Sequence, residues 1–454
     1  MHSQSSVWQK FQNDFSGKRV FLFGLGRQGG GAKVANTFVA AGAQVTVFDA
    51  LSEQQLQDSL AELDSSIELH LGVTEPDLTA AEYIIKNPAV PFNHFSVVAA
   101  QAAGIPVVGE TALAVAYLRD RCIGITGTRG KTTTTTLTGK LLEAAGWKVV
   151  VGGNIPQFPA LSLLPECDDD TWAVLEISSF QLESFAHVQA SPHIAVVTNV
   201  YPDHLNRYAS LEEYAQTKAE IFRFQQAGDA ALFAGPVEWH ETFQKNISPE
   251  AEQQSVSASE VEQVKNRYRT QLPGDHNWEN IAMVDAIRES LQIPVAALQT
   301  ALDSFTGVPY RLETIRELNG VRFVNDTTST TPVALEKALE AFAPGSFVLI
   351  TGGATKHLPL EKALLEKLAQ NPAAVFILPG TGSSELQAAA ANAGLSLPNL
   401  QQVQDLAGAV QQAFAWAQEK HIPTVLFSPG FTSFEMFKNE FDRGDHFNRY
   451  VRDL

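Results

Sequence analysis

Cysteine is scarce in this 454-residue sequence, which contains only Cys122 and Cys167 and no Cys-x-x-Cys pair. Neither a disulfide framework nor a thiolate metal site is therefore indicated. The sequence also lacks an apolar run long enough to span a bilayer. Residues 1–18 are polar and lack the apolar core of a secretory signal. These absences predict a cytoplasmic protein that has no membrane partner.

Basic residues are also few relative to acidic ones. The sequence contains 32 lysine and arginine residues and 50 acidic residues, which gives a formal net charge of -18. This balance argues against nucleic acid as a partner, since a phosphate backbone requires a basic face. With 44% hydrophobic residues, the composition is that of an ordinary globular protein. The length exceeds what one core accommodates and predicts two or three domains.

A glycine-rich stretch, Gly124–Thr133, lies between an apolar segment and a helical segment at residues 135–145. A strand, a glycine turn and a helix start together form a cradle for phosphate. In such a cradle Lys131 reaches the terminal phosphates of ATP and the Thr132 hydroxyl ligates Mg²⁺. The spacing is shorter than the full P-loop pattern, so a chance match in a glycine turn is the alternative. The predicted ATP-binding residues here are Gly127, Thr128, Arg129, Gly130, Lys131, Thr132 and Thr133.

A second glycine motif, G-x-G-x-x-G at Gly24, Gly26 and Gly29, follows an apolar strand at residues 19–26. The next apolar strand ends at Asp49, where dinucleotide-binding folds place an acid on a ribose. The motif alone leaves NAD, another nucleotide and simple helix–strand packing open. Further strand–helix alternation predicts a first domain over residues 1–117.

In the second predicted domain, residues 118–307, polar residues follow apolar strands. Glu176 ends the strand at 172–175, and a lone acid at a strand's carboxyl end suits Mg²⁺. His204 follows the strand at 194–198, where it is either a metal ligand or a structural group; its place near the phosphate loop favours the ligand. Lys218 lies on a helix predicted at 214–224, with a solvated surface lysine as the alternative. Asn154, Ser178 and Gln181 are expected on the same rim.

Two asparagines at i and i+3, Asn277 and Asn280, share one face of a helix and suit a nucleobase, with helix capping as the alternative. The third predicted domain, residues 308–454, opens with Arg311 near the expected linker. Its first strand runs into the hydroxyl-rich turn 325–332, which suits anion or ribose contact, with capping of the next helix by Thr330 or Thr331 as the alternative. Its last strand runs into 428–433, where a helix is expected to start.

Taken in order, these motifs resemble the Mur ligase family over essentially the whole length. Mur ligases are ATP-dependent amide-forming enzymes of peptidoglycan synthesis, and the similarity is greatest to members that add D-glutamate to UDP-N-acetylmuramoyl-L-alanine. The resemblance implies three α/β domains: a Rossmann-like N-terminal domain, a central P-loop ATPase-like domain and a Rossmann-like C-terminal domain. The motifs that carry it are Gly124–Thr133, Gly152–Pro156, Leu175–Glu183, Thr198–His204 with Lys218, Gly274–Asn280, Pro309–Glu313, Asn325-Asp326 and Ser428–Phe437.

The resemblance also implies residue roles and a monomeric enzyme. The catalytic residues would be Lys131, Glu176, His204 and Lys218, and two Mg²⁺ ions would be held by Thr132, Glu176, His204 and a carbamylated Lys218. Asn277, Arg311 and Asp326 would complete the ATP site. The UDP substrate and glutamate would be bound by Gly24, Leu25, Gly26, Arg27, Gly29, Asp49, Asn87, Asn154, Ser178, Gln181, Thr330, Lys356, Ser433 and Phe437.

Some residues depart from the family pattern. Thr328 stands where D-glutamate-adding members carry lysine, and Ser329–Pro332 resembles the branch that adds L-glutamate. The same reaction with L-glutamate is therefore an alternative. The motifs also leave open a folylpolyglutamate synthetase, an NAD enzyme, and a catalytically idle sensor of nucleotides or UDP-sugars on the same fold. The joint presence of Lys131, Glu176, His204 and Lys218 argues against the sensor.

Overall fold

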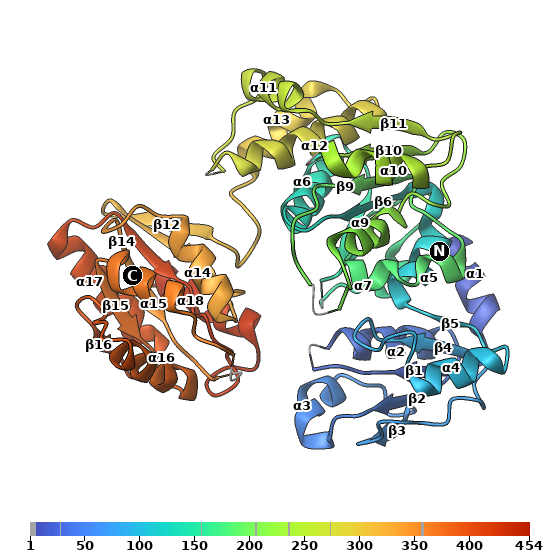
Figure 1. Ribbon diagram of the computed structural model, residues 1–454, viewed down its shortest axis with the longest axis horizontal. Coiled ribbons are helices and arrows are strands. Elements are labelled where there is room, and N and C mark those ends of the chain that lie inside the picture. Colours follow the sequence, from blue (N-terminus) through green and yellow to red (C-terminus); the bar gives the residue numbers. More distant parts are fainter. Residues whose placement is uncertain are drawn as a thin grey trace. The chain divides into compact units, whose positions relative to one another are not determined.

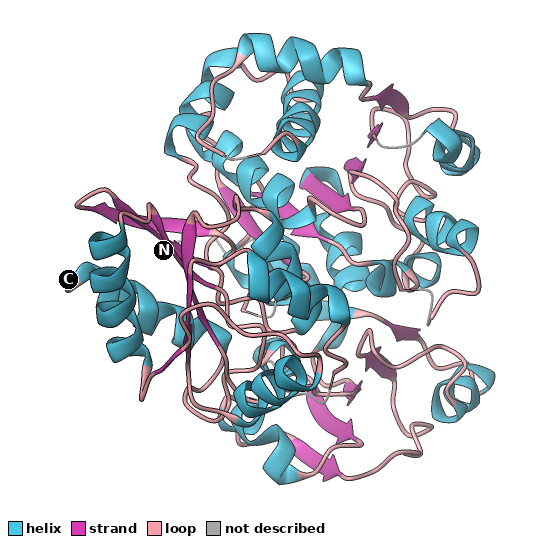
Figure 2. Ribbon diagram, turned by 60° about the vertical axis from the view of Figure 1, so that its left-hand side comes forward, coloured by secondary structure: helices cyan, strands magenta, loops and turns pink. Residues whose placement is uncertain are grey.

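The computed structural model describes residues 6–27, 29–155, 157–204, 207–234, 237–272, 274–355 and 358–454. The chain forms two compact units, Met1–Phe305 with two sheets and Thr306–Leu454 with one. Helices pack beside the strands of each sheet, as Figure 2 shows. The predicted α/β class is confirmed, whereas the domain boundaries at 117 and 307 stay predictions. Within the described ranges, no helix combines the length and apolar character needed to cross a bilayer.

The first sheet of the first unit is five-stranded and parallel, in the order β3-β2-β1-β4-β5 (Figure 1). Its central strand is an apolar run that is buried beyond its first residue, as expected for a parallel sheet covered on both faces. The order matches the start of the dinucleotide-binding fold. The elements are α1 (Ser6–Phe15), β1 (Arg19–Phe23), α2 (Gly30–Ala40), β2 (Gln44–Asp49), α3 (Glu53–Ala61), β3 (Glu68–Leu71), β4 (Tyr83–Lys86), α4 (Phe95–Ala102), β5 (Val107–Val108) and α5 (Glu110–Leu118).

The second sheet is six-stranded and parallel, in the order β11-β10-β9-β6-β8-β7. The polar segment that begins at residue 252 forms the edge strand and a following helix. The elements are η1 (Arg119–Arg121), β6 (Cys122–Thr126), α6 (Lys131–Ala144), β7 (Val149–Gly153), η2 (Ala160–Glu166), β8 (Trp172–Glu176), α7 (Ser179–Leu182), α8 (Phe185–Val188), β9 (Ile194–Val197), α9 (Leu211–Ala219), β10 (Ala230–Phe233), η3 (Val237–Trp239), α10 (His240–Asn246), β11 (Glu252–Ser255), α11 (Ala258–Arg267), α12 (His276–Ser290) and α13 (Val295–Ser304).

The sheet of the second unit has the order β12-β13-β17-β14-β15-β16, with only β12 antiparallel to its neighbour. The expected helix start at 428–433 is wrong. That segment is a loop, and the last helix begins at Glu440, where Asn439 caps it by accepting hydrogen bonds from two amides of the first turn. The elements are β12 (Glu313–Leu318), β13 (Val321–Asn325), α14 (Pro332–Glu340), β14 (Phe347–Thr351), α15 (Lys362–Gln370), β15 (Ala374–Ile377), α16 (Thr381–Asn392), β16 (Gln401–Gln402), α17 (Leu406–Lys420), β17 (Thr424–Phe427) and α18 (Glu440–Arg452).

Candidate active site

The loop between β6 and α6 has the backbone of a phosphate cradle. Gly127 has a φ of 147°, in the region that favours glycine. Asn199 fixes the next two residues, because its carbonyl and side-chain oxygens accept hydrogen bonds from the Thr128 and Arg129 amides at 2.9 and 2.8 Å. The helix then begins at Lys131, four residues earlier than predicted. The amides of its first turn therefore lie at the loop, which is the arrangement that binds anions.

Lys131 lies over this loop. Its Nζ donates hydrogen bonds to the carbonyl oxygens of Gly127 and Thr128, at 3.0 and 3.1 Å. Thr132 and Thr133 follow it in the first turn of α6, and both are half-buried. The loop therefore offers an ammonium and hydroxyls at the same helix N-terminus.

Two asparagines of α12 support the loop from the other side. Asn280 packs so closely on Gly130 that a Cβ added to that glycine would lie 2.1 Å from the Asn280 Oδ1. The Asn280 side-chain amide also donates a 3.1 Å hydrogen bond to the Asn277 Oδ1. Both side chains are buried, and neither is the cap residue of α12, which is Asp275. The predicted shared face is confirmed, and the capping alternative is not supported.

Glu176 lies at the carboxyl end of β8, which pairs with β6 on one side and β7 on the other. Its carboxylate is buried and accepts a 3.0 Å hydrogen bond from the Asn154 side chain, while the Asn154 amide donates to the Glu176 carbonyl at 2.7 Å. Pairing of Ile125 with Glu176 places this acid beside the strand that leads into the phosphate loop. Glu176 and Asn154 are therefore held together at one edge of the sheet.

Lys218 is a buried lysine, with only 1% of its surface exposed, so the solvated-surface alternative is wrong. It lies on α9, with its Nζ 4.3 Å from the centre of the Tyr214 ring. Burial lowers the pKa of Lys218 far below its ordinary value; the positive charge of Lys131 lowers it further, and Asp203 partly offsets this. The neutral amine is therefore the favoured form of the Lys218 side chain, which lies near the phosphate loop.

His204 lies in the same neighbourhood, with its ring centre 5.0 Å from that of Phe180 and 6.1 Å from that of Tyr214. Its backbone is left-handed, with a φ of 53°, and its amide donates a 2.8 Å hydrogen bond to the Asp203 carboxylate. Nearly half of the imidazole is exposed, so it is accessible to a ligand. In the described part of the chain, no three His, Cys, Asp or Glu residues form a ready-made metal cluster.

Ser178 and Gln181 form a reciprocal cap at the start of α7. The Ser178 amide donates to the Gln181 Oε1 at 2.8 Å, and the Gln181 amide donates back to the Ser178 hydroxyl at 3.4 Å. Gln181 is buried, whereas Ser178 is half-buried. Both residues therefore have a structural function in α7 in addition to the substrate contact that the sequence suggests.

The glycine loop after β1 is organised by Asp49. The Asp49 carboxylate accepts hydrogen bonds from the amides of Leu25 and Gly26 at 2.7 and 3.1 Å, and is itself buried. Asn87, at the end of β4, donates a 3.3 Å hydrogen bond from its side chain to the Gly24 carbonyl. Arg27 is exposed, and Gly29 has a left-handed backbone just before α2. The predicted residues of this loop therefore lie together, but Asp49 already holds two of its amides.

In the second unit, Asp326 is buried at the carboxyl end of β13. It accepts hydrogen bonds from the Ser428 hydroxyl at 2.8 Å and the Leu312 amide at 3.2 Å. Burial raises the pKa of Asp326 to about 7, and the bond from Ser428, the Leu312 amide and the charge of Arg311 only partly oppose this. Arg311 itself is exposed. The carboxyl is therefore held close to its protonation midpoint at neutral pH.

This pKa predicts a pH-dependent stability. The folded-state pKa of Asp326 lies above its unfolded value of 3.8, so the stability it contributes is present below pH 4 and is lost as the pH rises through about 7. Relative to Asp326→Asn, the wild type should lose stability between pH 4 and 8, by about 4 kcal/mol at most. Thermal unfolding of both proteins across this range measures the difference. Asp453→Asn, which removes an exposed carboxylate, is the control. The prediction would be contradicted if the difference in stability between wild type and Asp326→Asn stayed constant across this pH range.

The hydroxyl-rich turn after β13 is partly occupied by local contacts. Thr328 donates from its hydroxyl to the Tyr310 carbonyl at 2.9 Å, and Thr331 caps α14. Thr330 is half-buried between them. Capping by Thr331, one of the two expected alternatives, is confirmed. The predicted glutamate contact Lys356 lies outside the described residues.

Arg443 is a buried residue that sequence reasoning missed. It lies on α18 with 1% of its surface exposed, and its guanidinium donates to the Thr327 carbonyl and hydroxyl at 2.9 and 3.1 Å and to the Phe431 carbonyl at 3.1 Å. It lines a narrow hollow with Ser433 and Phe437, both predicted site residues. The Ser433 hydroxyl is buried and makes no hydrogen bond to any described residue. A buried cation and an unpaired hydroxyl in one hollow suit an anionic ligand.

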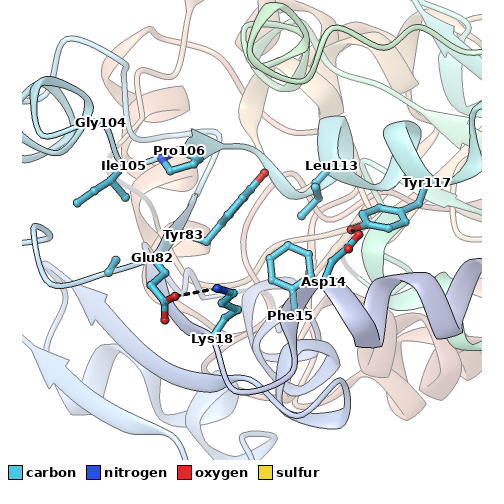
Figure 3. Close-up of a pocket in the computed structure, with 11 residues that line it drawn as sticks. Asp14, Phe15, Lys18, Glu82, Tyr83, Gly104, Ile105, Pro106, Leu113 and Tyr117 are labelled. Carbon is cyan, nitrogen blue, oxygen red and sulfur yellow. Dashed lines mark hydrogen bonds and ion pairs between the residues drawn. The ribbon is translucent and has the colours of Figure 1, made fainter.

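A cavity of about 640 Å³ lies elsewhere in the first unit. Figure 3 shows Lys18, Glu82 and Pro106, which precede β1, β4 and β5, together with Leu113 and Tyr117 of α5. The cavity is therefore at the amino ends of the first sheet's strands. The glycine loop is at their carboxyl ends, so this cavity is separate from the candidate site.

Comparison with known proteins adds to this geometry. Three family profiles match in chain order: the MurD-like N-terminal domain of Mur ligases over residues 18–109, the Mur ligase middle domain over 125–287, and the glutamate ligase domain of Mur ligases over 310–430. A Roseiflexus protein named UDP-N-acetylmuramoylalanine--D-glutamate ligase is 37% identical, covering 96% of this chain and 98% of its own. The chain belongs to the Mur ligase family.

Other Mur ligases agree with this placement. Proteins of the same name from Koribacter versatilis and Streptococcus agalactiae are 33% and 32% identical; the alignments cover 97% and 95% of this chain and 98% and 96% of theirs. The crystal structure of UDP-N-acetylmuramate-alanine ligase from Thermotoga maritima, 19% identical, matches with a TM-score of 0.56 over 96% of this chain and all of that one. The structural match confirms the predicted three-domain fold.

Proposed function

We propose that this chain is an ATP-dependent amide ligase that joins D-glutamate to UDP-N-acetylmuramoyl-L-alanine in peptidoglycan precursor synthesis. The observation that carries the proposal is the phosphate loop with Lys131, beside the strand-end acid Glu176 and the buried amine of Lys218. The relatives named above, which align over nearly the full length, support the choice of substrates. The cytoplasmic location and monomeric state expected from the sequence stay predictions.

ATP is the proposed ligand of the loop between β6 and α6. Lys131 would move from the loop carbonyls onto the terminal phosphates, and the first-turn amides of α6 would bind the same anion. Asn277, Arg311 and Asp326 are the proposed further contacts to the nucleotide. The crystal structure of a second Thermotoga maritima protein, MurF ligase, which is 17% identical to this chain, is a complex with ADP.

Two Mg²⁺ ions are proposed to accompany ATP. Mg²⁺ commonly binds through one or two carboxylates together with substrate phosphates, so the lack of a closed protein cluster among the described residues does not conflict with such a site. Thr132 and Glu176 would hold one ion, and His204 and Lys218 would help to hold the other. Bound there, Mg²⁺ would supply charge neutralisation to the triphosphate and the attacking carboxylate.

To help to hold a Mg²⁺ ion, the Lys218 side chain would have to carry a negative charge. Its suppressed pKa favours the neutral amine, which is the form that adds CO₂ to give a carbamate. Carbamylation would convert this buried neutral amine, with release of a proton, into an anion that the nearby ammonium of Lys131 stabilises. The positive charge of Lys131, which disfavours the free lysine cation, is thus the feature that would favour the anionic modified residue.

The two other substrates have their own proposed loops. The UDP end would bind at Gly24–Gly29, Asp49 and Asn87, and the muramoyl-alanine end at Asn154, Ser178 and Gln181. Glutamate would bind in the second unit through Thr330, Lys356, Ser433 and Phe437. Arg443, in the same hollow as Ser433, would contribute the positive charge that a glutamate carboxylate needs.

The reaction then has two steps. The alanine carboxylate attacks the γ-phosphorus of ATP, the bond to the bridging oxygen breaks, and ADP leaves an acyl phosphate behind. Lys131 offsets the charge repulsion of this step. The glutamate amine next attacks the acyl carbon, loses a proton and expels inorganic phosphate as the amide forms.

A phosphate-release assay with UDP-N-acetylmuramoyl-L-alanine, ATP and Mg²⁺ tests the proposal. Turnover is expected with D-glutamate and not with L-glutamate, and mass spectrometry should identify the amide product. Turnover with L-glutamate alone would contradict the stereochemistry and point to Ser329–Pro332. No turnover with either amino acid would contradict the ligase function and favour a nucleotide sensor. Nicotinamide absorbance in the purified protein would instead favour an NAD enzyme.

A further inference from the structure

Helix α5 joins the two sheets of the first unit, and its amino end packs against the start of α7. The Gly109 amide, just before α5, donates a 3.0 Å hydrogen bond to the Ser184 hydroxyl. The next two residues, Glu110 and Thr111, are buried, with 9% and 1% of their surfaces exposed. A carboxyl group and a hydroxyl in this position need partners in the protein interior.

Those partners form a continuous chain of hydrogen bonds. The Leu161 amide donates to the Glu110 Oε2 at 3.0 Å, and the Thr111 hydroxyl donates to the Glu110 Oε1. The Gln181 Nε2 donates to the Thr111 Oγ1 at 2.7 Å, and the Gln181 Oε1 accepts from the Ser178 amide at 2.8 Å. The chain of hydrogen bonds therefore runs from η2, through α5, to the amino end of α7.

The two ends of this chain of hydrogen bonds fix its direction together: Glu110 accepts from Thr111 at one end, and the Ser178 amide donates to Gln181 at the other. A threonine hydroxyl has one hydrogen, so a Thr111 that donates to Glu110 can only accept from Gln181. Gln181 must then point its NH₂ group at Thr111 and its carbonyl oxygen at Ser178. Without the Glu110 acceptor, Thr111 could donate to Gln181, and the Gln181 side-chain amide could turn by 180° and break the cap of α7.

We propose that Glu110 and Thr111 are positioning residues for the muramoyl-alanine end of the substrate. They act through Gln181 and Ser178, whose orientation they fix, rather than by touching the substrate. The assignment of Ser178 and Gln181 to that substrate rests on the proposed function. Since α5 follows β5, the edge strand of the first sheet, the same bonds connect the end of that sheet to α7.

Thr111→Val is the decisive variant, because it keeps the shape of the side chain and removes its hydroxyl. The KM for UDP-N-acetylmuramoyl-L-alanine should rise about five- to tenfold, the effect of one buried hydrogen bond, with the KM for ATP unchanged. Thr111→Ser should restore the wild-type KM. Combined with Gln181→Leu, Thr111→Val should add no further loss, because it acts through that residue. Thr138→Val is the matched control, since the buried Thr138 hydroxyl makes no hydrogen bond to any described residue.

Hydrogen exchange of the segment 176–183 tests the same bonds without substrate. Thr111→Val should raise deuterium uptake in this segment at least about fivefold, and Thr138→Val should not. This result would stand even if the wild type failed to turn over the substrate, so the two proposals fail separately. The positioning function is overturned if exchange in this segment stays at the wild-type rate, if both KM values rise equally, or if the double variant shows additive losses.

Discussion

Lys218→Met is expected to lower kcat at least about 100-fold, the size of effect found when a group that stabilises developing charge is lost. Methionine keeps the length of the buried stem and cannot form a carbamate. Because the Lys218 ammonium is disfavoured by burial and by Lys131, its removal should leave the Tm within a few degrees of wild type. Steady-state turnover together with thermal unfolding measures both effects.

The carbamate itself can be observed. Wild-type protein supplied with ¹³C-bicarbonate should show a carbamate carbon resonance, and its activity should fall in CO₂-free buffer and return with bicarbonate. Lys218→Met should show neither behaviour. Lys140→Ala, which removes an exposed lysine paired with Glu143 on α6, should retain wild-type activity and CO₂ dependence. Wild-type turnover by Lys218→Met would rule out the proposed function of this lysine.

Features set by neighbouring residues are predictable from the sequence. The phosphate loop is one of them, because a strand, two glycines and a helix start follow one another within about ten residues, and local backbone preferences decide such a unit. Glu176, Asn154 and Asp49 are predictable because each ends or directly follows an apolar strand. The carboxyl ends of parallel strands meet at one edge, so position along the chain determines position in space.

Features set by distant packing are not predictable in this way. Nothing in the local sequence distinguishes Lys218 from a surface lysine, because its burial depends on elements that pack against α9, such as α7 and α10. Asp49 is expected at a ribose, yet its carboxylate binds the amides of Leu25 and Gly26. Which hydrogen bonds a carboxylate accepts depends on the conformation of the folded loop, and this cannot be predicted from the sequence pattern alone.

The start of α18 and the burial of Arg443 do have a signal in the sequence. Asn439 is followed by acidic residues and then by buried positions at helical spacing, which indicates a cap and an inward face. The serine and glycine residues at 428–433 favour an earlier start, and that start is wrong. Once the helix begins at Glu440, Arg443 falls on the inward face, where an arginine is unusual enough to suggest a function.

Arg443→Met is expected to raise the KM for D-glutamate about 100-fold or more. The variant removes the buried cation that shares a hollow with Ser433, and loss of one partner from a buried, charge-assisted contact costs about 2 to 5 kcal/mol. It also leaves the Thr327 and Phe431 carbonyls without their donor, so the Tm of the second unit should fall. Steady-state kinetics at varied glutamate, with ATP saturating, measures the main effect.

The geometry of the guanidinium gives this prediction its control. Arg443 donates in three directions from one rigid plane, to two carbonyls and one hydroxyl, and a lysine ammonium at the same place cannot reproduce that fork. Arg443→Lys should therefore keep the charge without restoring the KM for glutamate. Arg449→Met, at an exposed arginine on the same helix, should leave the KM within about twofold of wild type. If Arg443→Met instead raised the KM for ATP as much as that for glutamate, Arg443 would be a residue that stabilises the whole unit, and the anionic ligand of this hollow would have to be sought elsewhere.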